Sequence, residues 1–192
     1  MKKLIINGLI VFAVGLLTPQ FVKAQGNLVV NGGFNTDASG WMTTNEFGFG
    51  YVSDKGDPGG YFFLYSSSSS LTPTISQTIS NLIPGSSYIV SGNYMQVMGS
   101  SENPSFGVAL NGSYLFETAE PPNSNWYGFS LDYVATSVNA LLNLSSQLNG
   151  TGVSYGIDNI SMKLVPEPSD SWLLLLGGVV FIYIRSRKHH SA

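Results

Sequence analysis

The chain has no cysteine, and its only two histidines, His189 and His190, lie among its last four residues. Without cysteine there can be no disulfide, no thiol nucleophile and no cysteine-ligated metal. Because residues 25–165 contain no histidine, a Ser-His-Asp relay or a histidine-held zinc is excluded there as well.

Charged residues are also scarce. They make up 10% of the chain, against about 25% in an average domain. Residues 25–165 contain two lysines, Lys55 and Lys163, and nine acidic residues, for a net charge of about −7. With no basic patch to displace counterions from phosphates, nucleic acid is excluded as a partner. The surface must consist largely of Ser, Thr, Asn, Gly and Tyr, which suits neutral partners.

The first 24 residues have the pattern of a secretory signal peptide. Two lysines precede an apolar stretch from Leu4 to Leu17, and Val22-Lys23-Ala24 places small residues where signal peptidase cuts. The pattern predicts cleavage after residue 24 and export of the mature chain. An uncleaved anchor is the alternative, but Pro19 and Gln20 end the apolar stretch early.

Residues 166–192 combine the run Pro166-Glu167-Pro168, an apolar block from Trp172 to Ile184, and a basic end with Arg185 and Arg187. At 1.5 Å per residue the predicted helix 172–184 reaches about 20 Å, against a hydrocarbon core of about 30 Å. It is therefore a marginal membrane span, and its cationic end is expected to stay in the cytoplasm.

These three features together resemble the PEP-CTERM sorting signal of Gram-negative bacteria that make exopolysaccharide. The resemblance implies recognition by an inner-membrane exosortase. The protein would first be a membrane-anchored intermediate and would then be transferred to the cell surface or the extracellular matrix. An ordinary single-span anchor is the alternative.

The intervening segment, residues 25–165, is long enough for one domain with a real core. Short apolar/polar alternations recur along it, separated by turn signals such as Pro84-Gly85 and Asn111-Gly112, and no helical stripe of useful length appears. The pattern predicts an all-β, antiparallel two-sheet sandwich. The expected strands are 74–79, 88–97, 105–111, 126–135, 139–145 and 157–165.

Strand parity sorts these residues into two faces. The side with the larger apolar residues is assigned to the core: Tyr88, Val90, Tyr94, Phe106, Val108, Leu110, Tyr127, Phe129, Leu131, Tyr133, Ala140, Leu142, Leu144, Ile160, Met162 and Leu164. Trp41 is assigned to the core too, and core packing is favoured over ligand contact for Phe47, Phe49 and Tyr51. The opposite faces are mainly polar, and they form one surface if their strands are neighbours.

Three separated pieces resemble the carbohydrate-binding modules of families 4 and 9, which are galactose-binding-like jelly rolls. They are Asn27 to Phe34 followed by Gly40-Trp41, then Ser76 to Ile79 with Leu82 to Gly85, and last Gly156 to Met162. Their order and spacing cover nearly the whole segment, so the resemblance implies a jelly-roll fold. It says less about a ligand, because this fold also serves structural roles.

In that family a structural calcium is commonly held near the first and last strands. The closing position matches Asp158, while the opening one has Asn35, with Asp37 nearby as a substitute. A lost carboxylate should weaken such a site, because affinity follows ligand charge and number. Parity puts Asp158 on the side of Ile160, so it should be partly buried and need a partner. Calcium and backbone amides are both candidates for that partner.

Sugar binding needs an aromatic plane for the apolar face of a pyranose and amides or carboxylates for its hydroxyls. Trp126, Asn93, Asp132 and Asn143 are the candidates here. The alternative for Trp126 is packing against its own domain.

The sequence thus predicts a non-catalytic exported protein that lives in, or binds, extracellular polysaccharide. One alternative is a glycan hydrolase, which would need two carboxylates about 5–9 Å apart across a cleft. Asp132, Glu117 and Glu120 are the available acids near the polar face, and no spacing pairs them. The other alternative is a matrix protein without glycan affinity.

Overall fold

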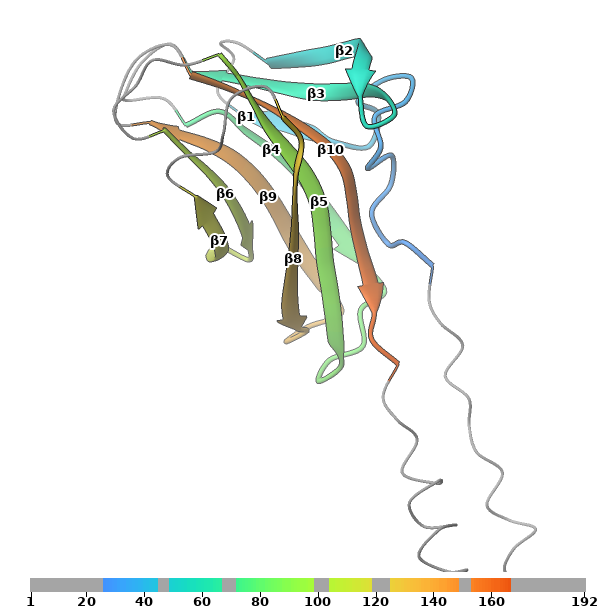
Figure 1. Cartoon of the computed structure of the whole chain (residues 1–192). Helices are drawn as coiled ribbons and strands as arrows, with labels where there is room; N and C mark the ends of the chain where they lie inside the picture. Colours follow the sequence, from blue (N-terminus) through green and yellow to red (C-terminus); the bar gives the residue numbers. More distant parts are fainter. Residues whose placement is uncertain are drawn as a thin grey trace, which may run out of the picture. The chain divides into compact units, whose positions relative to one another are not determined.

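The two-sheet prediction is confirmed. A computed structural model describes residues 26–44, 49–66, 72–98, 104–118, 125–148 and 153–166. These residues form two five-stranded antiparallel sheets stacked face to face (Figure 1). The strands are β1 (Met42–Thr44), β2 (Phe49–Gly56), β3 (Gly59–Ser66), β4 (Thr74–Ser80), β5 (Ser87–Met98), β6 (Pro104–Leu110), β7 (Ser113–Thr118), β8 (Tyr127–Val134), β9 (Asn139–Leu148) and β10 (Val153–Leu164).

Sheet A has the strand order β1-β4-β9-β6-β7, and sheet B has the order β2-β3-β10-β5-β8. The register follows the alternation in the sequence: Ile75 pairs with Leu144 and Ile79 with Ala140, so that apolar side chains share the inner face of sheet A. The turn at Asn111-Gly112, with φ values of 51° and 80°, joins β6 to β7.

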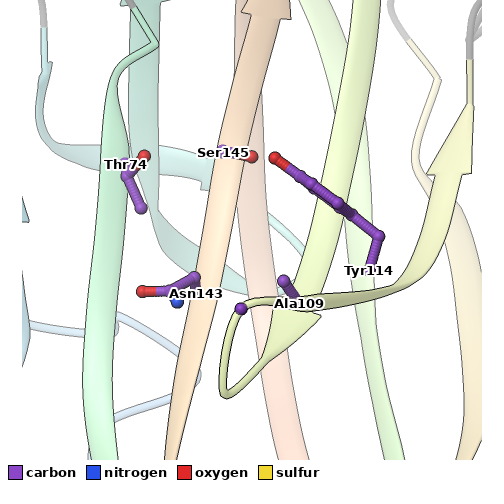
Figure 2. Close-up of a pocket in the computed structure, with 6 residues that line it drawn as sticks. Thr74, Ala109, Tyr114, Asn143 and Ser145 are labelled. Atoms are coloured by element: carbon purple, nitrogen blue, oxygen red, sulfur yellow. The ribbon is translucent and has the colours of Figure 1, made fainter.

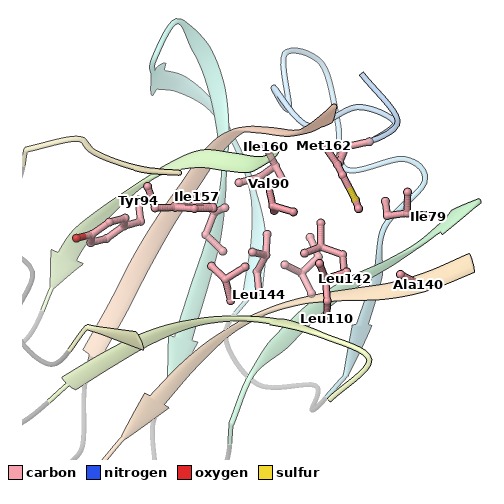
Figure 3. Packing of buried hydrophobic residues seen from close by; sticks show 14 of the residues in the cluster. Ile79, Val90, Tyr94, Leu110, Ala140, Leu142, Leu144, Ile157, Ile160 and Met162 are labelled. Atoms are coloured by element: carbon pink, nitrogen blue, oxygen red, sulfur yellow. The ribbon is translucent and has the colours of Figure 1, made fainter. Parts of the chain in front are cut away.

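The core lies between the sheets, where side chains from both meet in one layer (Figure 3). The residues assigned inward on β5, β6, β9 and β10 are buried there, while Tyr127, Leu131 and Tyr133 of β8 are partly buried against it. Tyr94 of sheet B stacks on Phe106 of sheet A, with ring centroids 5.1 Å apart. This stack is one of several aromatic contacts that join the two sheets.

Trp41 packs against the core as expected, although it is only partly buried. Its ring lies 5.5 Å from that of Phe34, and its indole N–H donates to the Asn31 carbonyl at 3.1 Å. Tyr51 also packs against the core.

β3 was not expected from the sequence. Its run Tyr61-Phe62-Phe63-Leu64-Tyr65 is apolar on both faces, so the period of two cannot be seen. Phe62 and Leu64 point into the core, and the three other aromatic residues lie on the outer face of sheet B.

β10 is the middle strand of sheet B, between β3 and β5. Near both ends of the compact unit Gln25–Val165, the backbone forms hydrogen bonds with β10 or from its end to β5. The Leu28 N–H donates to the Met162 carbonyl at 2.9 Å, and the Val165 N–H donates to the Ser87 carbonyl at 2.9 Å.

Several predictions fall outside the described residues, namely the signal peptide over residues 1–24, the helix 172–184 and the sorting-motif residues after Pro166. Within the described part of the chain, no helix is long and apolar enough to cross a membrane.

Candidate functional site

A hollow of about 280 Å³ lies on the outer face of sheet A (Figure 2). Strands β4, β6, β7 and β9 and the β6–β7 turn contribute its walls. The lining residues are Thr74, Ala109, Gly112, Tyr114, Asn143 and Ser145. None of these six residues carries a charge.

Tyr114 reaches this face because β7 contains an irregularity. Ala109 pairs with Tyr114, whereas the next residue back, Val108, pairs with Phe116, so Leu115 is an extra residue. The bulge lets Tyr114 face outward and Phe116 face inward, where its ring stacks on Phe129.

A glycine makes room for the Tyr114 ring. A Cβ added to Gly107 would come within 2.8 Å of Tyr114 Cε1 and 3.3 Å of Ser145 Oγ. The ring therefore lies across β6, with its hydroxyl end directed toward Ser145 (Figure 2). Half of its surface stays exposed, at 51%, and it forms an aromatic wall beside the polar residues of β4 and β9.

The polar groups of the hollow are arranged by strand register. Thr74 pairs with Ser145 across β4 and β9, and Asn143 lies two residues before Ser145 on the same face. Hydroxyl and amide groups both donate and accept hydrogen bonds. The hollow thus combines an aromatic plane with neutral groups of both kinds.

The four predicted glycan-binding residues do not share one surface. Asn143 lines the hollow on sheet A, whereas Trp126, Asn93 and Asp132 belong to sheet B or the segment leading into it. The condition for a single polar face, that the strands are neighbours, is not met, because β9 lies in a different sheet from β5 and β8. Asn93 donates from Nδ2 to Asp57 Oδ2 at 2.8 Å, and Asp132 is exposed opposite Ile89.

Asp158 is fully buried, but not on the side that parity predicts. The register slips by one residue between Asp158 and Ser161, and Asn159 has a φ of 54°. Asp158 therefore pairs with Asn93 on the outer face of sheet B, opposite to the core-facing Ile160. The turn between β2 and β3 covers it there.

Two backbone N–H groups hold the Asp158 carboxylate. Asp57 N–H donates to Oδ2 at 2.6 Å, and Asn159 N–H donates to Oδ1 at 2.7 Å. Burial raises the pKa of Asp158, these two hydrogen bonds lower it in part, and the nearby Asp57 charge raises it further. The carboxylate thus has two backbone amides as hydrogen-bond partners.

The side-chain amides of Asn35 and Asn159 lie near the β2–β3 turn that covers this carboxylate. A Cβ added to Gly33 would lie 3.3 Å from Asn35 Nδ2 and 3.7 Å from Asn159 Oδ1, so these two amides meet at one point. The Asn159 amide donates to the Asp57 carbonyl. Tyr51 fixes the Asn35 backbone, because its hydroxyl donates to the Asn35 carbonyl at 3.1 Å.

Asp37 is held elsewhere in the opening loop. Its Oδ1 accepts from the Ser39 N–H at 2.9 Å and from Asn31 Nδ2 at 3.0 Å, and these contacts lower its pKa. Among the described residues, no three His, Cys, Asp or Glu side chains come together as a metal site. The donors near Asp158 are nevertheless of the kind that calcium takes, namely carboxylate and amide oxygens.

Sequence reasoning missed Tyr114 and Asp57. The β7 bulge that turns Tyr114 outward leaves no trace in an alternation pattern. For Asp57 a signal was present, since Asp57-Pro58-Gly59-Gly60 is a strong turn sequence. A hairpin expected there would have brought Asp57 into consideration with the closing strand.

No protein-family model matches the chain, and neither does any curated protein. Solved structures do. TmCBM61, solved with β-1,4-galactotriose, is 15% identical with a TM-score of 0.58, and the match covers 74% of this chain and 100% of that one. The CBM22-1 xylan-binding domain of Paenibacillus barcinonensis Xyn10C is 17% identical, with a TM-score of 0.55 and coverage of 76% and 98%.

A third match is the enzymatically active domain of tailspike protein 4 from bacteriophage CBA120, at 15% identity and a TM-score of 0.56. It covers 72% of this chain but only 21% of the tailspike chain. At identities this low, these matches show a shared fold alone. The described residues between 26 and 166 thus have the jelly-roll fold found in carbohydrate-binding modules.

Proposed function

We propose that residues 25–165 form a non-catalytic module that binds a neutral polysaccharide in the hollow of sheet A. The observation that carries the proposal is the position of Tyr114, laid across Gly107 beside Asn143 and Ser145. A pyranose ring has apolar C–H faces and a rim of hydroxyls, so it matches an aromatic wall flanked by neutral donors and acceptors.

Two further observations support this reading. The jelly-roll fold is shared with carbohydrate-binding modules, one of which was solved with β-1,4-galactotriose. A hydrolase would need paired carboxylates, and the six residues that line the hollow include none. Of the candidate acids, Asp132 lies on sheet B and Glu117 on sheet A, which favours binding without catalysis.

The calcium prediction can be made more specific. Asp158 and Asp57 would supply carboxylates, and Asn35 and Asn159 would supply amide oxygens. A bound calcium would neutralise a buried carboxylate and tie the opening loop and the β2–β3 turn to β10. Asp37 is less suited, because its carboxylate is bonded within the opening loop, to Asn31 and Ser39.

Export and sorting complete the proposal, and they rest on the sequence alone. The signal peptide would direct the chain across the inner membrane, and the Pro166-Glu167-Pro168 motif with its apolar helix and arginines would present it to an exosortase. The module would then act at the cell surface or in the extracellular matrix. Comparing the mass of the mature protein from wild type and from a Glu167→Ala strain tests the sorting step.

Glycan binding is tested by affinity electrophoresis of the full-length protein in mild detergent through gels that contain β-1,4-galactan or xylan. We expect retardation in at least one gel, and about a tenfold loss of affinity for Tyr114→Ala. Thr78→Ala is the control, because Thr78 is an exposed residue of β4 outside the hollow. Equal retardation of Tyr114→Ala and wild type would exclude this hollow as the site.

A further inference from the structure

A second hollow, of about 330 Å³, lies on the outer face of sheet B. It is lined by Lys55, Tyr61, Met95, Val97 and Trp126. These residues come from β2, β3, β5 and the segment before β8. It shares no lining residue with the hollow on sheet A.

A glycine lets its two large aromatic side chains meet. Gly156 of β10 pairs with Met95, and a Cβ there would lie 3.0 Å from the Tyr61 ring and 3.2 Å from Trp126 Cη2. The two rings make an edge-to-face contact, with centroids 5.7 Å apart and an angle of 78° between their planes. Tyr61 is buried, while Trp126 is partly exposed and forms a wall of the hollow.

The hollow also holds one of the two cations of the 25–165 segment. Lys55 lies where the β2–β3 register is irregular, and its φ of 66° is in the left-handed region that a lysine rarely adopts. Nine acidic residues share the segment with only Lys55 and Lys163. A lysine at this particular position, on an otherwise acidic domain, marks the hollow as a local site for negative charge.

The polar groups of the lining are mainly hydrogen-bond donors. The Lys55 ammonium and the Trp126 indole N–H can only donate. The Tyr61 hydroxyl can both donate and accept, and burial and then the nearby Asp54 charge raise its pKa. Met95 and Val97 add apolar surface. The hollow on sheet A, in contrast, has amide and hydroxyl groups that both donate and accept.

We propose that this second hollow binds an acidic sugar unit, a pyranose ring that carries a carboxylate. The ring would lie against Trp126, and the carboxylate would accept from Lys55. Asp54 lies close enough to Tyr61 to oppose the same carboxylate, so it should weaken binding. The site goes beyond the proposed neutral-glycan site and is independent of it. Together the two would let one domain hold two different polysaccharide chains.

The test is affinity electrophoresis of the full-length protein against polygalacturonate, in low and in high salt. We expect retardation that weakens as salt rises. Lys55→Gln should lower affinity about two- to fivefold, as for an exposed ion pair. Asp54→Asn should raise affinity by a similar factor. Neither change should alter retardation by β-1,4-galactan.

Lys163→Gln is the matched control, since it removes the other lysine and changes the net charge equally. If it weakens binding as much as Lys55→Gln, the interaction is nonspecific and the proposal fails. Trp126→Ala should reduce affinity about tenfold, and Trp126→Phe, which keeps a ring, should retain most of it. Tyr114→Ala should still bind polygalacturonate normally.

The experiment tests the two proposed sites separately. If wild type passes unretarded through polygalacturonate, the acidic-sugar site is excluded, whatever happens in galactan or xylan. Absence of retardation by the neutral polymers, with polygalacturonate binding intact, would contradict the neutral-glycan site alone.

Discussion

Gln77 binds both sides of the Val30 peptide backbone. Its Oε1 accepts from the Val30 N–H at 2.8 Å, and its Nε2 donates to the Val30 carbonyl at 2.9 Å. The same Nε2 donates to the Gly40 carbonyl at 3.1 Å. Gln77 lies on the inward side of β4 and is buried, so a single amide fastens the opening loop to sheet A.

Gln77→Ala should therefore lower the free energy of unfolding by about 1–3 kcal/mol, since it removes three part-buried hydrogen bonds to the opening loop. Urea denaturation monitored by tryptophan fluorescence measures the loss. The neighbouring exposed change Thr78→Ala should stay within about 0.5 kcal/mol of wild type. Equal stability of the two variants would show that the loop is held by other contacts.

Gly107→Ala should separate binding from stability. The added methyl group would displace the Tyr114 ring, because it would come within 2.8 Å of Cε1. The ring belongs to a partly exposed side chain that can move, so the free energy of unfolding should change by about 1 kcal/mol or less. Retardation by the neutral glycan should fall about tenfold. Gly128→Ala is the control, since its nearest contact would be an ordinary 3.6 Å.

The buried Asp158 predicts a pH effect in the absence of calcium. Its pKa is raised in the folded state, so the folded protein binds more protons than the unfolded chain between the ordinary carboxyl pKa and the raised value. The stability that this group contributes is complete below the ordinary pKa, and it is lost as pH rises through the raised one. Urea denaturation in EDTA, across pH 4 to 7, measures the slope.

Asp57→Asn provides the comparison, because it removes the like charge that helps to raise the Asp158 pKa and keeps the backbone N–H. The loss of stability with rising pH should be smaller in this variant. A larger loss would contradict the electrostatic account.

Calcium should stabilise the domain if Asp158 and its neighbours bind it. At a free concentration one hundred times the dissociation constant, the gain would be about 2.7 kcal/mol. A rise in the melting temperature with calcium, reversed by EDTA, measures this. Asp158→Ala should abolish the response and Asp57→Ala should reduce it, whereas Asp37→Asn should leave it intact. A full response in Asp158→Ala would place the ion elsewhere.

The sequence was sufficient for the fold class and for the inward residues of β5, β6 and β9, because these strands have one apolar face and one polar face. It was not sufficient for β3, since Tyr61, Phe63 and Tyr65 make its outer face apolar as well. Alternation predicts which side of a strand a residue occupies, but not which strands are neighbours.

That limit explains why the predicted site residues do not lie together. Asn143 and Trp126 have suitable chemistry, but they lie on different sheets, and the pairing of distant strands decides this. The outward positions of Tyr114 and Asp158 each depend on one extra residue in a strand. The extra residue reverses the side that alternation predicts. Asp158 is buried as predicted, although the cover is the β2–β3 turn and not the core.

The position of β10 has a mechanical consequence. A pull on the chain beyond Val165 would act along the axis of β10, which is hydrogen-bonded to β3 on one edge and to β5 on the other. Extraction would then shear the ladder with β5, which runs to Leu164, and also the ladder with β3 over Val153 to Ile157. An edge strand, in contrast, is held by one ladder. A protein tethered through this end could bear tension from a captured polymer without unravelling.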